Sequence, residues 1–328
     1  MLTGTNIDKA AALLREGKLV VFPTETVYGL GANAMDALAV ARVFAMKERP
    51  NFDPLIVHIS SLDQMEQLFQ APIDPQVYEL AKAFWPGPLT IVYTKQSRVP
   101  DLITSGLDTV AVRMPSHPIA LELIRKAGVP VAAPSANKFG CLSPTQASHV
   151  IKQNMHPDYI LDGGSTDFGI ESTVVSVTEE GVRILRYGAI TEEHLSKHVK
   201  VISGHKADGD HLPHAPGMLK SHYAPRKPLY ILDTIDHLDL PEGSGLIVGA
   251  ESKAKLYPAI KTRSLSQHGD MNEMAVNLFA VLHQMEDDEQ VKQIYFEAIP
   301  ETGIGKAIMD RARKAAYSYL KTNEDTDA

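Results

Sequence analysis

Two cations stand close together at the end of a predicted helix. Lys47 and Arg49 follow a helical apolar pattern and lie just before Pro50, which favours the end of a helix. Side chains two positions apart diverge on a continuing helix, whereas an extended turn lets them converge on one anion. Arginine offers a planar fork and lysine a compact charge, and both suit phosphate. The pair is our first candidate for catalytic, phosphate-binding residues; the alternative is a pair of surface charges that complement the helix dipole.

A polar loop precedes that helix. The apolar run 19–22 predicts a buried strand, Pro23 ends it, and residues 23–28 (PTETVY) lead to Gly29 and Gly31, where the backbone can turn or approach a ligand closely. Asp36 is a candidate N-cap for the helix, and an apolar run near 55–59 predicts the next strand. The simplest interpretation is a βαβ unit. A dinucleotide fingerprint is disfavoured, because six residues separate the first strand from Gly29.

Further strands and helices must hold these groups in place. A strand over 109–113 (TVAVR) delivers Arg113 at its end, where a bidentate grip on a carboxylate is possible, and a helix begins at Pro118. Strands interleaved with helices without strict alternation predict an α/β domain with a mixed sheet. The other predicted helices lie near 7–16, 61–69 and 76–85 and from Pro144, and the other strands near 129–133, 158–161, 172–177 and 182–186.

Periodicity breaks between about 203 and 227. This stretch is rich in Gly, Pro and His and predicts an interdomain linker. Its four histidines do not have the spacing of a compact zinc site. Apolar Met218, Leu219 and Tyr223 lie among prolines, so we expect 215–225 to be a lid over a ligand site rather than a passive tether. Strands near 229–232, 245–249 and 293–296 and helices near 271–285 and from Lys306 then predict a small α/β domain.

Composition limits the class of protein. The 328 residues are 44% hydrophobic and 22% charged, as in a globular protein with room for two domains. The first eighteen residues lack the pattern of a signal peptide, and the single cysteine, Cys141, cannot form an internal disulfide, so we expect a cytoplasmic protein without a membrane segment. A net charge of −8 argues against tight autonomous binding of nucleic acid, but not against a transient contact.

Several separated motifs resemble one family. FPTETVYGLGANA, K-x-R-P followed by PLIVHI, PSAN at 134–137, SPT at 143–145 and APGMLKSHYAP at 215–225 are similar to the threonylcarbamoyl-AMP synthase family in its two-domain form. The resemblance implies a YrdC-like α/β catalytic domain with a mixed twisted sheet over 1–202. A linker or lid over 203–227 and a small Rossmann-like domain over 228–328 would follow.

The resemblance also implies an activity. A nucleotidyltransferase of this family condenses L-threonine, bicarbonate and ATP, with Mg²⁺, to threonylcarbamoyl-AMP and pyrophosphate, and a separate transferase complex passes the group to tRNA. Such chemistry needs cations and oriented donors but no side-chain nucleophile, and the sequence has no nucleophile elbow. Two alternatives remain: a non-catalytic RNA-binding protein, and carbamoyl transfer to another acceptor.

By similarity, particular residues bind each substrate, and no metal ligand from the protein is expected. Asp53 departs from the family, in which an amide is more frequent. The residues implied for L-threonine are Thr26, His58, Arg113, Ala133 and Ser172, and those for ATP are Arg49, Asp53, Thr109, Ser135, Asn137, Ser143, Arg186 and Tyr223.

Overall fold

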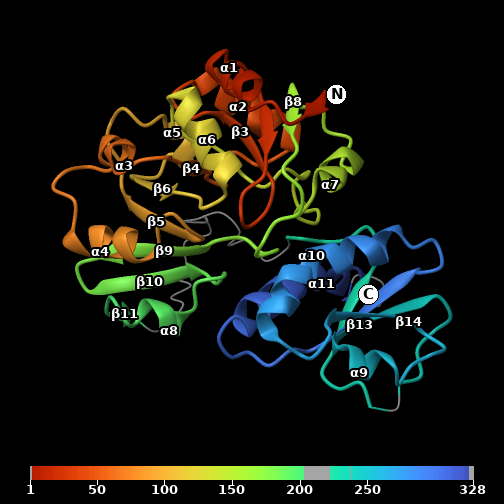
Figure 1. Cartoon of the computed structure of the whole chain (residues 1–328). Helices are drawn as coiled ribbons and strands as arrows, with labels where there is room; N and C mark the ends of the chain where they lie inside the picture. Colours follow the sequence, from red (N-terminus) through yellow and green to blue (C-terminus); the bar gives the residue numbers. More distant parts are fainter. Residues whose placement is uncertain (1, 203–221, 237, 325–328) are drawn as a thin grey trace. The chain divides into compact units, whose positions relative to one another are not determined.

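The computed structural model describes residues 2–202, 222–236 and 238–324, and the chain forms two units (Figure 1). The first unit comprises Met1–Phe139, Pro144–Asp167 and Glu171–Met218, and the second comprises Gly140–Ser143, Phe168–Ile170 and Leu219–Ala328. Most of the stretch for which the sequence predicts a linker and lid, 203–221, lies outside the described residues. Within the described part of the chain, no helix is both long and apolar enough to span a bilayer.

The described part of the first unit contains one mixed sheet, as predicted. Its strand order is β1-β8-β2-β3-β7-β4-β6-β5-β9-β10-β11. Strand β4 runs parallel to β6, whereas β5 runs antiparallel to β6 and parallel to β9. The strands are β1 (Thr3–Gly4), β2 (Val20–Phe22), β3 (Gly29–Asn33), β4 (Ile56–His58), β5 (Leu89–Thr94), β6 (Thr109–Arg113), β7 (Val131–Ala132), β8 (Tyr159–Leu161), β9 (Thr173–Thr178), β10 (Gly181–Arg186) and β11 (Val201–Ile202).

The helices of this unit follow the signals in the sequence. Helix α2 begins after Asp36, whose side chain accepts hydrogen bonds from the amides of Leu38 and Ala39, and it ends at Lys47. Helix α6 begins at Pro118, as predicted. The helices are α1 (Ile7–Arg15), α2 (Ala37–Lys47), α3 (Leu62–Leu68), α4 (Pro75–Phe84), α5 (Asp101–Thr104), α6 (Pro118–Ala127), α7 (Ala147–Lys152) and α8 (Glu192–Leu195).

The predicted βαβ unit is wrong in one respect. Residues Gly29–Asn33 form β3, which pairs antiparallel with β2 before α2 begins, so the chain first makes a hairpin. Two glycines permit this close pairing. A Cβ at Gly31 would lie 2.8 Å from Cε1 of Phe22 and 3.0 Å from Cγ1 of Val131. These glycines therefore allow strand packing, which periodicity did not reveal.

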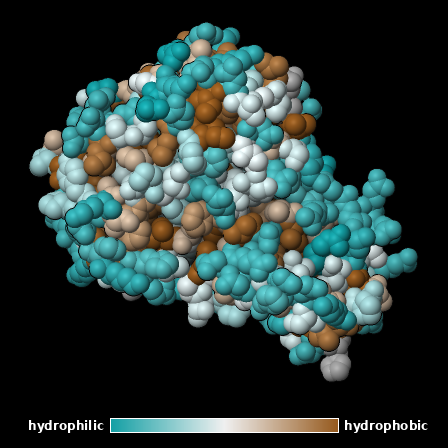
Figure 2. Space-filling model, in the orientation of Figure 1, coloured by the Kyte–Doolittle hydropathy of each residue, from teal (hydrophilic) through white to brown (hydrophobic). Residues whose placement is uncertain are grey.

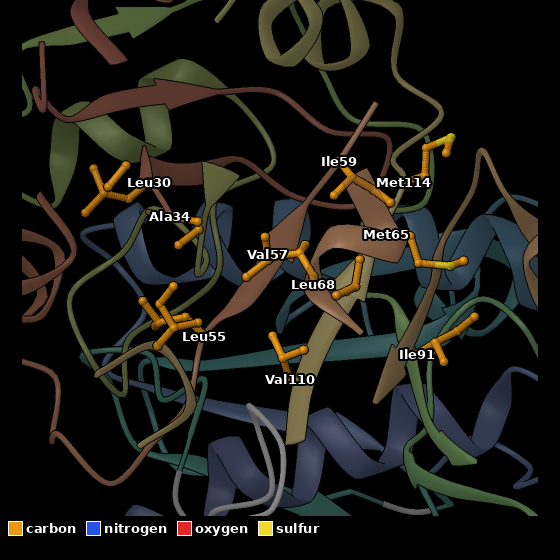
Figure 3. Close-up of a cluster of buried hydrophobic side chains, with 14 of the residues drawn as sticks. Leu30, Ala34, Leu55, Val57, Ile59, Met65, Leu68, Ile91, Val110 and Met114 are labelled. Carbon is orange, nitrogen blue, oxygen red and sulfur yellow. The ribbon is translucent and has the colours of Figure 1, made fainter. Parts of the chain in front are cut away.

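The two faces of the large sheet differ in chemistry. Since side chains alternate along a strand, Leu55, Val57 and Ile59 share one face, where they pack with Met65 and Leu68 of α3 in the main core (Figure 3). On the opposite face, α1 and α6 cover the end formed by β8, β2, β3 and β7. The middle of that opposite face, from β4 to β10, carries only a small apolar cluster of Ile56, Val92, Ala111 and Val174, partly covered by Leu185. We call this middle part the polar face.

The second unit is built on a parallel sheet, which confirms the predicted Rossmann-like domain. The order of its described strands is β12-β15-β13-β14, and all three pairings are parallel. Helix α10 packs against β14 and α11, and its Leu278, Phe279 and Leu282 are buried. The elements are β12 (Leu229–Leu232), β13 (Ser244–Ala250), α9 (Glu251–Ala254), β14 (Lys261–Ser266), α10 (Met271–Asp287), β15 (Gln293–Glu297) and α11 (Gly305–Glu324).

Apolar and hydrophilic residues are interspersed on the face that Figure 2 shows. Among the described residues, the large apolar side chains that are exposed are distributed along both units. They are Leu2, Leu38, Phe52, Leu62, Tyr78, Ile151 and Leu256. Single exposed apolar residues of this kind are normal for a folded protein and indicate no particular partner.

Candidate functional site

Strand register places several predicted site residues together on the polar face. His58 of β4 pairs with Arg113 of β6, so both side chains emerge on the same side at the carboxyl ends of two parallel strands. Ala133, just after β7, is tied to the same place because its amide donates to the carbonyl of Ile56 at 2.9 Å. Side chains at the carboxyl ends of adjacent parallel strands meet at one edge, where ligands commonly bind in α/β sheets.

Arg113 is fixed by three partners and still keeps donors. Its Nε donates to the carbonyl of Gly87 at 3.2 Å and its Nη1 to Oγ1 of Thr26 at 2.8 Å. Its Nη2 lies 2.6 Å from Oε1 of Glu25 in an ion pair with both side chains buried. A guanidinium has five N–H groups, so both terminal nitrogens retain a donor for a carboxylate. The guanidinium at the end of TVAVR can therefore present a fork to a carboxylate.

Glu25 is a site residue that the sequence analysis did not assign. Burial raises the pKa of its carboxyl, but the charge and hydrogen bonding of Arg113 and backbone amides lower the pKa more, so its pKa lies below the ordinary value and Glu25 is ionised at neutral pH. The signal was present: Glu25 is the only charged residue between Lys18 and Asp36. A single carboxylate in an otherwise uncharged buried stretch needs a cationic partner.

His58 is neutral in the folded protein. Burial and the positive charge of Arg113 together lower the pKa of its imidazole to about 3, although Glu25 and backbone groups oppose this. The ring packs edge-on against Phe22, with 6.1 Å between centroids. Its Nδ1 is buried and has no hydrogen-bond partner among the described residues. A buried polar atom without a partner is rare in folded proteins and is consistent with a ligand contact.

Ser172 and Arg186 form the next part of the polar face. Oγ of Ser172 lies 2.8 Å from Oγ1 of Thr90, a β5 residue that the sequence analysis also missed. Nη2 of Arg186 donates to the carbonyl and to Oγ of Ser172, each at 3.0 Å. Arg186 at the end of β10 therefore holds the segment that precedes β9. Ser172, which the sequence analysis assigns to threonine, thus contacts Arg186, which it assigns to ATP.

The two cations after α2 are buried, which argues against the alternative that they are surface charges at a helix end. Lys47 is 1% exposed and Arg49 is 7% exposed. Nζ of Lys47 donates to the carbonyl of Ser135 at 2.5 Å and also to that of Asn137. Glu48 between the cations has a left-handed conformation with φ of 55°. The chain thus leaves the helix at Glu48, so the two side chains need not diverge as they would on a continuing helix.

Asp53 lies within this cationic group. Arg49 donates to the carbonyls of Asp53 and Pro54 at 3.0 and 2.9 Å, and its Nη2 lies 2.8 Å from Oδ2 of Asp53. Burial raises the pKa of Asp53 above its ordinary value, against the opposing charges of Arg49, Lys47 and Arg186. We call Lys47, Arg49, Asp53 and Arg186 the cationic cluster. It carries three positive charges around one acid and suits a polyanion.

Thr109 lies at the opposite end of β6 from Arg113. Four residues of extended strand separate them by about 13 Å. Because Ala111 pairs with Ile56, Thr109 lies level with Pro54, next to Asp53 and hence on the side of the cationic cluster. The loop with Ser135 and Asn137 is held by Lys47 and by a bridge between Gly29 and Ser135. The polar face thus has Arg113 and His58 at one end of β4 and β6 and Lys47, Arg49 and Asp53 at the other. Arg186 contacts Ser172 near the Arg113 end and still influences Asp53 through its charge.

Tyr223 and Ser143 belong to the second unit, which includes the short segment Gly140–Ser143. Tyr223 is 1% exposed and has a φ of 63°, which is uncommon for a residue other than glycine. Its ring packs on Phe279 at 5.4 Å between centroids and lies 5.5 Å from the guanidinium carbon of Arg311. The carbonyl of Ser143 lies 3.1 Å from Nε2 of His283. These contacts place both residues within their own unit.

The fold and the polar face define an α/β protein with a buried arginine fork and a cluster of buried cations on one face of its large sheet. A family model described as "Telomere recombination" matches residues 12–188, and one described as "Threonylcarbamoyl-AMP synthase, C-terminal domain" matches residues 190–317. The chain belongs to the threonylcarbamoyl-AMP synthase family, in its two-domain form.

Known relatives are similar over nearly the whole chain. The threonylcarbamoyl-AMP synthase of Bacillus subtilis is 43% identical over 94% of this chain and 92% of its own length. That of Pyrococcus abyssi is 44% identical over 95% of this chain and 94% of its own length. The crystal structure of P. abyssi Sua5 complexed with L-threonine matches with a TM-score of 0.85 at 40% identity, covering 96% of this chain and 97% of that one. The motifs quoted from the sequence therefore identified the family correctly.

Proposed function

We propose that this protein condenses L-threonine, bicarbonate and ATP to threonylcarbamoyl-AMP, with release of pyrophosphate, for the threonylcarbamoyladenosine modification of tRNA. One observation carries the proposal. The polar face has a carboxylate fork at one end of β4 and β6, with Arg113 beside neutral His58, and most of the cationic cluster at the other end. An amino acid and a triphosphate need these two kinds of group a short distance apart.

The residues divide between the substrates. We assign the threonine carboxylate to Arg113, with Thr26, Ser172 and the backbone of Ala133 as further contacts. His58 supplies an uncharged ring nitrogen, because its low pKa excludes a second positive charge in this place. Lys47 and Arg49 face the phosphates. The remaining nucleotide contacts that we propose are Asp53, Thr109, Ser135, Asn137, Ser143, Arg186 and Tyr223.

The reaction needs placement and charge stabilisation rather than a covalent intermediate on the protein. The ammonium group of threonine first loses a proton to solvent, and the free amine and bicarbonate then give a carbamate and water. A carbamate oxygen attacks the α-phosphorus in line while pyrophosphate leaves. Negative charge grows on the leaving group, and Lys47 and Arg49 are already desolvated and oriented by carbonyl groups, so little reorganisation is needed to meet it. Groups fixed in this way lower the barrier because their orientation precedes the reaction.

Mg²⁺ is the expected cofactor. We expect it to be held mainly by phosphate oxygens and water, because Mg²⁺ gives up its hydration reluctantly. Such an ion neutralises part of the triphosphate charge. The mixed anhydride then requires an acceptor amine, and we propose that a separate transferase complex passes the threonylcarbamoyl group to cytoplasmic tRNA. Because this protein has a net charge of −8, we expect at most a transient contact between it and the tRNA.

The test uses the purified full-length chain with ATP, L-threonine, Mg²⁺ and labelled bicarbonate. We expect pyrophosphate release that depends on threonine and bicarbonate, and label in a product that contains AMP and threonine. Pyrophosphate release without threonine, or label transferred to another amine, would favour carbamoyl transfer to a different acceptor. RNA binding without pyrophosphate release would favour a non-catalytic RNA-binding protein.

A further inference from the structure

Glu25 is the buried acid paired with Arg113, the arginine that we propose for the threonine carboxylate. It is 1% exposed, and its Oε1 lies 2.6 Å from Nη2 of Arg113. Arg113 and the backbone amides of Glu25 and Ser116 lie close enough to the carboxylate to lower its pKa. A carboxylate has about four acceptor sites, so one site remains for a further donor.

The charges of the site complement a zwitterion. L-threonine at neutral pH carries a carboxylate and an ammonium on one carbon atom. Arg113 alone would match the carboxylate and leave the ammonium desolvated without a partner, which is costly in a buried site. His58 is neutral, and Thr26 and Ser172 offer only hydroxyls. Compared with Thr26, His58, Arg113 and Ser172 at this end of the polar face, Glu25 is the residue whose side chain carries a negative charge.

We propose that Glu25 binds the α-ammonium group of threonine, so that Glu25 and Arg113 together recognise both charges of the amino acid. Without substrate the two side chains neutralise each other. When the zwitterion binds, each keeps a partner of opposite charge, and the net charge of the site does not change. The inference rests on the proposed function, because it assumes that threonine binds at Arg113. It makes Glu25 a specificity residue that requires a charged amino group.

The competing role for Glu25 is purely structural. In that case the carboxylate only holds Arg113 in position, and its loss would weaken every ligand that needs the arginine. The two roles differ for a ligand without an amino group. (R)-3-hydroxybutanoate has the carboxylate and hydroxyl of threonine but no ammonium, so it isolates the contribution of that group.

The experiment measures binding of both ligands by calorimetry, with displacement titration for the weaker one, at pH 7.5. Wild type should bind L-threonine at least about tenfold more tightly than (R)-3-hydroxybutanoate, as expected for one charge-assisted hydrogen bond. Glu25→Gln should weaken threonine about 10- to 100-fold. The same variant should bind (R)-3-hydroxybutanoate equally well or more tightly, because the positive charge of Arg113 is no longer neutralised. Glu122→Gln, which removes a carboxylate from a surface ion pair, is the matched control and should change neither affinity.

Equal weakening of both ligands by Glu25→Gln would overturn the proposal and leave Glu25 a positioning residue for Arg113. A wild-type preference for threonine below about threefold would also overturn it, and this comparison does not require the variant to fold. Circular dichroism and ATP binding check the fold of the variant. Failure of wild type to bind threonine at all would refute the proposed function itself, whereas normal threonine binding with an unaltered Glu25→Gln affinity would refute only this inference.

Discussion

Replacing His58 by glutamine should make the protein less sensitive to acid. The imidazole is buried, and its pKa falls from 6.5 to about 3 in the folded protein. In the unfolded chain the ring is in water and takes up a proton near pH 6.5. Below that pH, the proton stabilises the unfolded state and not the folded state. Stability that is complete above pH 6.5 is therefore lost as the pH falls, down to about pH 3.

The size of the effect follows from the two pKa values. Each pH unit between them changes the free energy of unfolding by about 1.4 kcal/mol per group. Between pH 7.5 and pH 5.0, His58 should cost wild type about 2 kcal/mol, because about 1.5 of those units lie below the unfolded pKa. The full interval to pH 3 would cost about 5 kcal/mol. The effect is large relative to the 5–15 kcal/mol typical of a folded protein.

The assay is urea unfolding of wild type and His58→Gln at pH 5.0, 7.5 and 9.0, followed by circular dichroism. If the two units unfold in separate steps, the transition of the first unit is analysed by itself. Other titrating groups contribute equally to both proteins and cancel in the difference. The variant loses less stability than wild type between pH 7.5 and 5.0, by about 2 kcal/mol. The interval from 7.5 to 9.0 is the control, since His58 is neutral there in both states. An identical pH dependence of wild type and variant would refute a buried neutral His58.

Three further predictions follow from contacts in the first unit. Lys47→Met should lower the rate of pyrophosphate release more than about 100-fold. It should also lower the free energy of unfolding by about 1–3 kcal/mol, because two buried carbonyl groups lose their donor. Lys138→Met, which removes a more exposed lysine, is the control, and near-normal turnover of the Lys47 variant would refute its role. Arg113→Lys should raise the threonine KM about tenfold or more, with a much smaller change in the ATP KM, because lysine lacks the fork; steady-state kinetics would contradict this if both constants rose together. Gly31→Ala should destabilise the protein by about 1–3 kcal/mol, since its Cβ would lie 2.8 Å from Phe22; Phe22→Leu in the same chain should restore part of the loss, and additive effects in urea unfolding would exclude that contact as the cause.

Local patterns in the sequence determined the elements and their ends. Strand β6 spans the predicted residues 109–113, α6 begins at Pro118, and α2 ends at Lys47 before Pro50. Alternation along β6 also specifies that Thr109 and Arg113 share a face. These features depend on residues a few positions apart, so periodicity and capping suffice to predict them. The family was likewise evident from motifs that each span a few residues.

Only the tertiary structure decided how these elements meet. The sequence offered no reason for β3 to pair with β2, because glycine has weak strand propensity and the pairing depends on close packing against Phe22. Burial of Lys47 depends on carbonyl groups 88 and 90 residues away. The ion pair of Glu25 with Arg113 likewise joins a residue of the loop between β2 and β3 to the end of β6. Charge and burial at such a site are set by partners distant in the sequence, and their arrangement exists only once the sheet has formed.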